Sequence, residues 1–202
     1  MTPLPVIIYR PPTQRSAVDN LVSWCRELDG TVATPFTRPE PTGLTYPGLP
    51  NWSFKQVAKH MKGKDFFWLE ADSIPLRKGW LSAITAEWQN AKRYGCHMMW
   101  PADYNAPHDR VGGIGVYSGE IDDIIPDGIT DTSFDGWAER NCMGLVHRTP
   151  LIQHRYAWYG KDGFVKRHHD FPPDLGVVRR DAVIFHKDAK QQLIQCVKEG
   201  RL

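Results

Sequence analysis

Long uninterrupted apolar runs are missing from this sequence of 202 residues. A membrane-spanning helix needs about 20 consecutive, mostly apolar residues, and no segment approaches that length. The N-terminus, Met1 to Arg10, also lacks the basic region and apolar stretch of a secretory signal. We therefore expect a soluble, cytoplasmic protein that has no membrane partner.

Closely spaced cysteines and a strong net charge are absent as well. Cys25, Cys96, Cys142 and Cys196 lie far apart in the chain, unlike the cysteine pairs of zinc knuckles, so we expect reduced, structural residues. The formal net charge of +2 is too small to indicate a nucleic-acid binder, although it leaves room for a local basic groove.

The composition is that of a folded protein. Hydrophobic residues make up 41% and charged residues 24%, as in soluble globular chains. A chain of 202 residues is long enough for one well-buried core and short for two, so residues 1–202 are expected to form a single domain. Eight tryptophans and sixteen prolines suit long ordered loops and apolar platforms for a base or a sugar.

Apolar and amphipathic segments alternate along the chain. Leu4 to Tyr9 has the pattern of a buried strand, and a helix is expected from Ser16, its N-cap, to Asp29. Residues 34–50, rich in Pro, Gly and Thr, are expected to form an ordered loop. Further helices are expected at 52–61 and 78–94, and strands at 65–69, 96–100, 113–117, 144–147 and 182–185. This order predicts an α/β fold in which the strands form one sheet.

Two carboxylates follow the strand expected at 65–69. Ligands of open α/β sheets bind at the carboxyl ends of strands, where Glu70 and Asp72 would lie. Alternate residues of an extended segment point to opposite sides, so one carboxylate could bind a divalent ion while the other holds a hydroxyl. Such an ion would neutralise charge on a departing nucleoside diphosphate. The alternative is an acidic turn in which Asp72 caps a following helix, and it is the commoner explanation of an isolated acidic pair.

The segment from Phe66 to Leu81, FFWLEADSIPLRKGWL, resembles the acidic DxD segment of glycosyltransferases with the GT-A fold. It is most similar to a small phage and bacterial subgroup with the pattern W-[ML]-E-x-D-x-x-P-[LI]-x-x-G-W-[LI]. Similar segments cover most of the chain: Tyr46-Pro47, Asn51 to Phe54, Gly112 to Ser118, Phe134-Asp135, Leu151 to His154 and Phe185 to Asp188. The resemblance implies a GT-A-like, Rossmann-related fold with a mixed, mainly parallel sheet flanked by helices, and a nucleotide-sugar-dependent hexosyltransferase.

The resemblance also implies a metal site for Mn²⁺ or Mg²⁺. Glu70 stands where the commoner pattern has Asp, which leaves Asp72 as the expected ligand. His186 is the expected second protein ligand, because GT-A enzymes often bring a C-terminal histidine to this ion. Lys187 would meet a phosphate as a point charge. Alternatively, His186 and Lys187 are solvated residues that follow an edge strand.

Asp135 lies where inverting enzymes of this fold carry the general base that deprotonates the acceptor hydroxyl. The alternative is an N-cap for the helix that contains Trp137, and a retaining mechanism would not need this base. Gly112-Gly113 permits close backbone approach to a ligand, and a tight turn explains it equally well. The residues assigned to donor binding are Arg10, Pro11, Thr13, Asn51, Glu70, Ala71, Gly113 and Lys187.

The implied donor is a nucleotide sugar, UDP-glucose first, and the acceptor is taken to be 5-hydroxymethylpyrimidine in phage DNA, which would place the protein in the host cytoplasm. Lys166-Arg167 and Arg179-Arg180 could meet DNA phosphates. Adjacent histidines point apart, so His168-His169-Asp170 is expected to be a solvated or acceptor-facing segment. The alternatives are a glycan or protein acceptor, a non-catalytic nucleotide- or carbohydrate-binding module, and a nucleotidyltransferase or phosphohydrolase, which would normally need more carboxylates.

Overall fold

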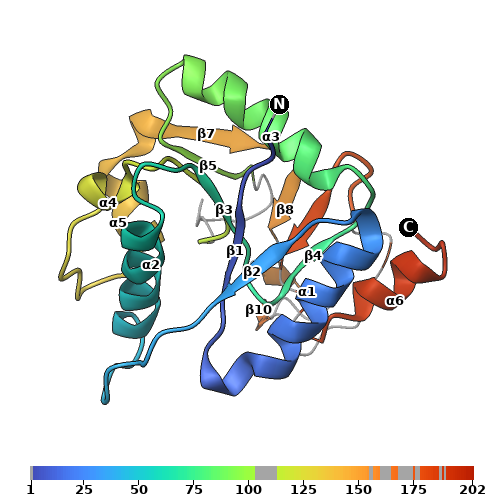
Figure 1. The fold of residues 1–202 in the computed structure, drawn as a ribbon, viewed down its shortest axis with the longest axis horizontal. Coiled ribbons are helices and arrows are strands. Elements are labelled where there is room, and N and C mark those ends of the chain that lie inside the picture. The colour runs from blue at the N-terminus through green and yellow to red at the C-terminus, as the bar shows by residue number, and fades with distance from the viewer. Residues whose placement is uncertain are drawn as a thin grey trace.

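The computed structural model describes residues 2–102, 113–154, 175, 178–186, 188 and 190–202, and only the backbone of 157–159 and 165–167. Within these residues the main sheet has six strands in the order β2-β1-β3-β6-β5-β7 (Figure 1). The bounds are β1 Val6–Tyr9, β2 Ala33–Phe36, β3 Phe66–Trp68, β5 Met98–Pro101, β6 Gly115–Tyr117 and β7 Val146–Thr149. Strand β6 is antiparallel to β3 and β5, and the other pairs are parallel. The prediction of a mixed, mainly parallel sheet is confirmed.

A second, smaller sheet lies beside the first. It consists of β4 (Ser73–Pro75), β11 (Ile184–His186) and β8 (Ile152–His154), in the order β4-β11-β8. Strand β11 is antiparallel to β4 and parallel to β8. The prediction that residues 182–185 complete the main sheet is therefore wrong, because their strand pairs with the three residues that follow the acidic segment. Strands β9 (Ala157–Tyr159) and β10 (Val165–Arg167) form an antiparallel pair.

Helices cover both faces of the main sheet (Figure 1). Alternation along β1 decides the faces: Val6 and Ile8 enter one apolar cluster with α1 and α3, whereas Ile7 enters the other with α2 and α5. The bounds are α1 Arg15–Asp29, α2 Gly48–His60, α3 Trp80–Arg93, α4 Ile121–Ile124, α5 Phe134–Asn141 and α6 Gln192–Lys198, with single 3₁₀ turns at Pro12–Gln14 and Met143–Leu145. Helix α6 packs on the α1 side through Leu193 and Ile194.

Two local predictions are wrong. Residues 34–50 are not one loop, because β2 begins at Ala33 and α2 already begins at Gly48. Only Ala33 and Phe36 of β2 are buried, so the strand shows little apolar pattern, and Pro35 is tolerated because β2 lies at the edge of the sheet. Ser16 is not the N-cap of α1: the preceding 3₁₀ turn runs into the helix, and Gln14 occupies the N-cap position.

The cysteines and the helices bear on two expectations from the sequence, namely reduced cysteines and no membrane-spanning helix. All four cysteines are free. Among the residues that the structure describes, no helix combines the length and apolarity needed to cross a bilayer.

Candidate active site

The acidic segment forms the crossing between the two sheets. Leu69 still donates its N–H to the carbonyl of Ile7 on β1, and Ala71 and Asp72 then form a turn closed by a hydrogen bond from Ser73 N–H to the Glu70 carbonyl, 3.0 Å. Strand β4 begins at once, so the alternative in which Asp72 caps a helix is wrong. The expectation that the two carboxylates point to opposite sides is also wrong, because it assumed an extended backbone.

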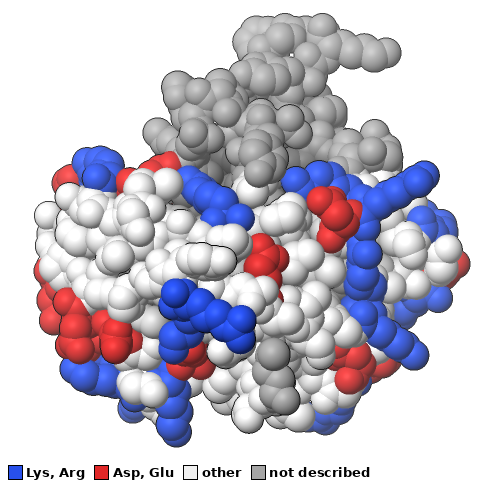
Figure 2. Space-filling view, turned by 90° about the horizontal axis from the view of Figure 1, so that it is seen from above, with Lys and Arg blue, Asp and Glu red and all other residues white. Residues whose placement is uncertain are grey.

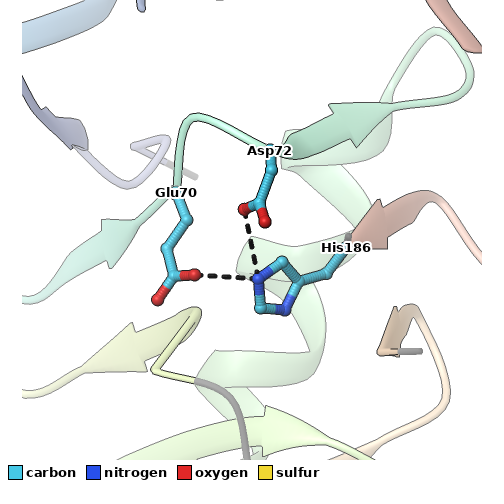
Figure 3. Close-up of side chains that lie close together, drawn as sticks. All are labelled: Glu70, Asp72 and His186. Carbon is cyan, nitrogen blue, oxygen red and sulfur yellow. Dashed lines mark hydrogen bonds and ion pairs between the residues drawn. The ribbon is translucent and has the colours of Figure 1, made fainter. Parts of the chain in front are cut away.

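The two carboxylates converge on His186 (Figure 3). Nε2 of His186 lies 2.8 Å from Oε2 of Glu70 and 3.3 Å from Oδ1 of Asp72. The imidazole is fully buried, whereas both carboxylates are partly exposed. His186 reaches the turn because β11 pairs with β4 in a register that sets His186 opposite Ser73. The structure thus brings together the two predicted ligands, Asp72 and His186, and adds Glu70.

The three side chains are chemically suited to a divalent cation. One potential ligand atom from each of Glu70, Asp72 and His186 lies within 4.8 Å of the other two. Carboxylate oxygens suit Mg²⁺ and Mn²⁺, and an imidazole nitrogen favours the transition metal of the two. The partial exposure of the carboxylates leaves space for ligands from water or substrate. The donor set therefore fits the ion that the sequence implies.

A cavity of about 470 Å³ opens beside this group. Its walls include Tyr9, Trp68 and Phe134, and the segment from Glu70 to Asp72 forms one side. Pro11, which was assigned to donor binding, also contributes to the wall. A volume of this size with apolar walls and a few polar groups is typical of small-molecule sites.

The other predicted donor residues have more varied positions. The guanidinium of Arg10 pairs with the Asp19 carboxylate on α1, 2.6 Å, and Thr13 is exposed in the 3₁₀ turn. The side-chain amide of Asn51 contacts backbone: Nδ2 donates to the carbonyls of residues 129 and 132, and Oδ1 accepts the N–H of residue 134. Lys187, Gly112 and residues 168–170 lie outside the described residues, so their roles stay predictions.

Gly113 lies against the site. A Cβ atom there would be 2.8 Å from Cζ of Phe134 and 3.0 Å from Oε1 of Glu70, so one or both of these side chains would have to shift to admit it. The described neighbours of Gly113 are thus two side chains of the site, and the expected approach to a ligand stays a prediction.

Asp135 lies in the first turn of α5, directly after Phe134. Ser133 occupies the N-cap position, so the alternative that assigned this cap to Asp135 is wrong. Burial raises the pKa of the Asp135 carboxyl, and the charge of Glu70 raises it further, whereas a hydrogen bond with Ser133 lowers it. Asp135 and Glu70 also both raise the pKa of the buried Tyr117 hydroxyl, where desolvation is the largest cause. Asp135 is therefore electrostatically coupled to the acidic turn.

Two residues to which sequence reasoning assigned no role contact the site: Gln191 bonds the acidic turn, and His154 contacts His186. Gln191 donates from Nε2 to the carbonyls of Ala71 and Ala17, 2.8 Å each, and accepts from Asn20 at 2.6 Å. His154 places Nδ1 2.6 Å from Nδ1 of His186. Both contacts join segments that are remote in the chain. His154 ends one of the segments that carry the resemblance, but no role was assigned to it, and no local pattern marks Gln191.

Comparison with known proteins places this geometry in a structural class. The fold is similar to that of the crystal structure of a glycosyltransferase involved in the glycosylation of the major capsid of PBCV-1, with a TM-score of 0.56 and 14% sequence identity. The match covers 98% of this chain and 100% of the other. The chain has a glycosyltransferase-like fold. No protein-family model and no curated protein matches the sequence. The fold implied by the FFWLEADSIPLRKGWL segment is thus confirmed, and the phage and bacterial subgroup stays a prediction.

Proposed function

We propose that this protein is a glycosyltransferase that depends on Mn²⁺ or Mg²⁺ and moves a hexose from a nucleotide sugar to a hydroxyl acceptor. The observation that carries the proposal is the convergence of Glu70, Asp72 and His186 beside the 470 Å³ cavity. The glycosyltransferase-like fold supports it. UDP-glucose is the donor to test first.

The charge of the site explains why a cation would be needed. Glu70 and Asp72 present two carboxylates at the side of the cavity where a diphosphate would approach, and like charges at this distance repel. With Asp72, Glu70 and His186 as its ligands, a divalent ion would supply Lewis-acid stabilisation of the departing nucleoside diphosphate. The apolar walls at Tyr9 and Trp68 would hold the nucleoside.

Asp135 is the proposed general base. Its raised pKa makes the carboxylate a stronger proton acceptor than an ordinary aspartate. In the transfer step, the acceptor oxygen forms a bond to the anomeric carbon and gives its proton to Asp135. The bond from that carbon to the phosphate oxygen breaks, and its electron pair leaves with the nucleoside diphosphate.

The proposed acceptor is a hydroxyl group on DNA or on a protein. The first acceptor is 5-hydroxymethylpyrimidine in DNA, supported by the exposed Arg180, which could meet a phosphate; its neighbour Arg179 is paired with Asp181. On the face shown in Figure 2, acidic side chains lie among the basic ones. The described residues of this face therefore form no continuous basic surface for DNA. A viral capsid protein is the second acceptor, because the PBCV-1 enzyme is involved in capsid glycosylation.

The test is donor turnover with controlled metal. Purified protein is stripped with chelator, and hydrolysis of UDP-glucose and transfer to each acceptor are followed by mass spectrometry as Mn²⁺ is restored. Asp72→Asn should lose metal-dependent turnover, whereas Asp131→Asn, an exposed aspartate paired with Arg140, should keep it. Full turnover by Asp72→Asn would refute the metal role. Donor binding with neither hydrolysis nor transfer would instead favour the non-catalytic module.

A further inference from the structure

The pairing of β8 with β11 places two histidines side by side. His154 and His186 are register partners in these parallel strands, and their Nδ1 atoms are 2.6 Å apart. Both rings are buried, with exposures of 3% and 0%. At this distance one nitrogen must carry the hydrogen and the other must offer a lone pair, because two N–H groups or two lone pairs would repel.

The opposite nitrogen of His186 faces the acidic turn. Nε2 is the atom that lies 2.8 Å from Glu70 and 3.3 Å from Asp72. A histidine that ligates a cation through Nε2 needs a lone pair there, so a neutral ring must keep its hydrogen on Nδ1. That hydrogen points at Nδ1 of His154.

We propose that His154 is a positioning residue for the cation site: its Nδ1 accepts the Nδ1–H of His186 and thereby holds the Nε2 lone pair of His186 toward Glu70 and Asp72. The inference rests on the metal dependence proposed above. Hydrogen-bond partners of this kind fix the tautomer and the ring orientation of a ligating histidine, and their loss typically costs about 10- to 100-fold in metal affinity.

At position 154 a histidine serves better than a side chain that can only accept a hydrogen bond from Nδ1 of His186. Without a cation, Nε2 of His186 can carry its hydrogen and donate to Glu70, and Nδ1 then accepts from His154. His154 can serve both states because an imidazole nitrogen donates in one tautomer and accepts in the other. The two rings carry the same total number of protons in both states, so the pair stays neutral as the site fills.

Two amide variants separate this role from packing. Asparagine places an amide group at the position of the histidine Nδ1, and it can either donate or accept there. Glutamine carries the same group one methylene farther out. We expect His154→Asn to bind Mn²⁺ close to the wild-type affinity and His154→Gln to bind it about 10- to 100-fold more weakly.

Mn²⁺ binding is measured without substrate, from the electron paramagnetic resonance signal of the free aquo ion, with circular dichroism melts as the folding control. Steady-state assays should show the loss in His154→Gln as a raised requirement for Mn²⁺ that saturating metal restores. Equal affinity in both variants, whether high or low, would overturn the role of the Nδ1 contact and leave the proposed function standing. Absence of Mn²⁺ binding in the wild-type protein would overturn the metal dependence and the inference together.

A measurement on the wild-type chain keeps the inference testable if a variant fails to fold. Long-range ¹H–¹⁵N spectra of the imidazoles distinguish the two tautomers, and diamagnetic Mg²⁺ can be used as the probe. Saturating Mg²⁺ should give the Nδ1–H tautomer of His186. Retention of the Nε2–H form with Mg²⁺ bound would refute the inference.

Discussion

Asn51 was predicted to contact the donor, but its side chain is hydrogen-bonded to the protein backbone. The resemblance assigned it to the donor, whereas its described contacts tie α2 to the segment that enters α5. Nδ2 donates to the carbonyls of Ile129 and Thr132 at 2.9 Å each, and Oδ1 accepts the N–H of Phe134 at 2.5 Å. Asn51→Ala removes all three hydrogen bonds at a residue that is only 7% exposed.

The expected loss of stability follows from these three bonds. A hydrogen bond contributes about 1 kcal/mol net, so their sum is about 3 kcal/mol. For a chain of this length each kcal/mol lowers Tm by about 2–4 °C, which gives a decrease of roughly 6–12 °C. Turnover should fall as well, because the loosened segment carries Phe134, a wall of the cavity, and Asp135.

The assay is a thermal melt by circular dichroism together with steady-state kinetics on the donor. Asn141→Ala is the matched control, because Asn141 makes one exposed bond to the Trp137 carbonyl and should lower Tm only slightly. A donor contact predicts a different pattern, in which KM for the donor rises and Tm is unchanged. That pattern would refute the structural role of Asn51.

Gly113→Ala should raise KM for metal and donor, because the added Cβ meets both Phe134 and Glu70; unchanged kinetics would show that these neighbours move freely. Asp135→Asn should lower transfer by about 10²–10⁴-fold. Because its folded-state pKa is raised above 3.8, ionised Asp135 opposes folding above that pKa, and the penalty disappears as pH falls through it. Transfer by the wild-type protein should decline as the pH falls through the pKa of Asp135. At pH 8 the Tm of Asp135→Asn should be no lower than that of the wild type, and a lower Tm would contradict the expected destabilisation by ionised Asp135. Glu70→Asp withdraws the carboxylate by one methylene from His186 and should weaken Mn²⁺ binding measured by calorimetry; an unchanged affinity would remove Glu70 from the ligand set.

The sequence was most informative where one segment carries its own periodicity. Val18, Leu21, Cys25 and Leu28 recur at helical spacing and are all buried in α1. The apolar run at Phe66, Phe67 and Trp68 is buried on both faces, as expected of a central strand. The spacing of buried residues within one helix or strand depends only on which of its faces meets the core. Such an element can therefore be predicted without knowing which other elements pack against it.

The pairing of the second sheet escaped this reasoning. Strands β4, β8 and β11 are each too short to show a period, and their sheet exists only through pairing between residues about 30 to 110 positions apart. The turn at Glu70 to Asp72 was misjudged for the same reason: its shape is set by the pairing of the strand that follows it. Gln191 and His154 act through contacts with remote segments, so neither role can be predicted from the local sequence, although His154 lies within a segment that carries the resemblance.

The second sheet therefore explains how residues that the resemblance groups together meet in the fold, while the geometric argument from an extended backbone failed. The acidic turn supplies two carboxylates from one local segment, but the buried nitrogen between them depends on the register of β11 against β4. A slip of one residue would turn His186 to the other face of that sheet and present Phe185 to the carboxylates. A second register, that of β8 against the other edge of β11, sets His154 beside His186. One strand of three residues thus fixes both the third potential ligand and the group that orients it.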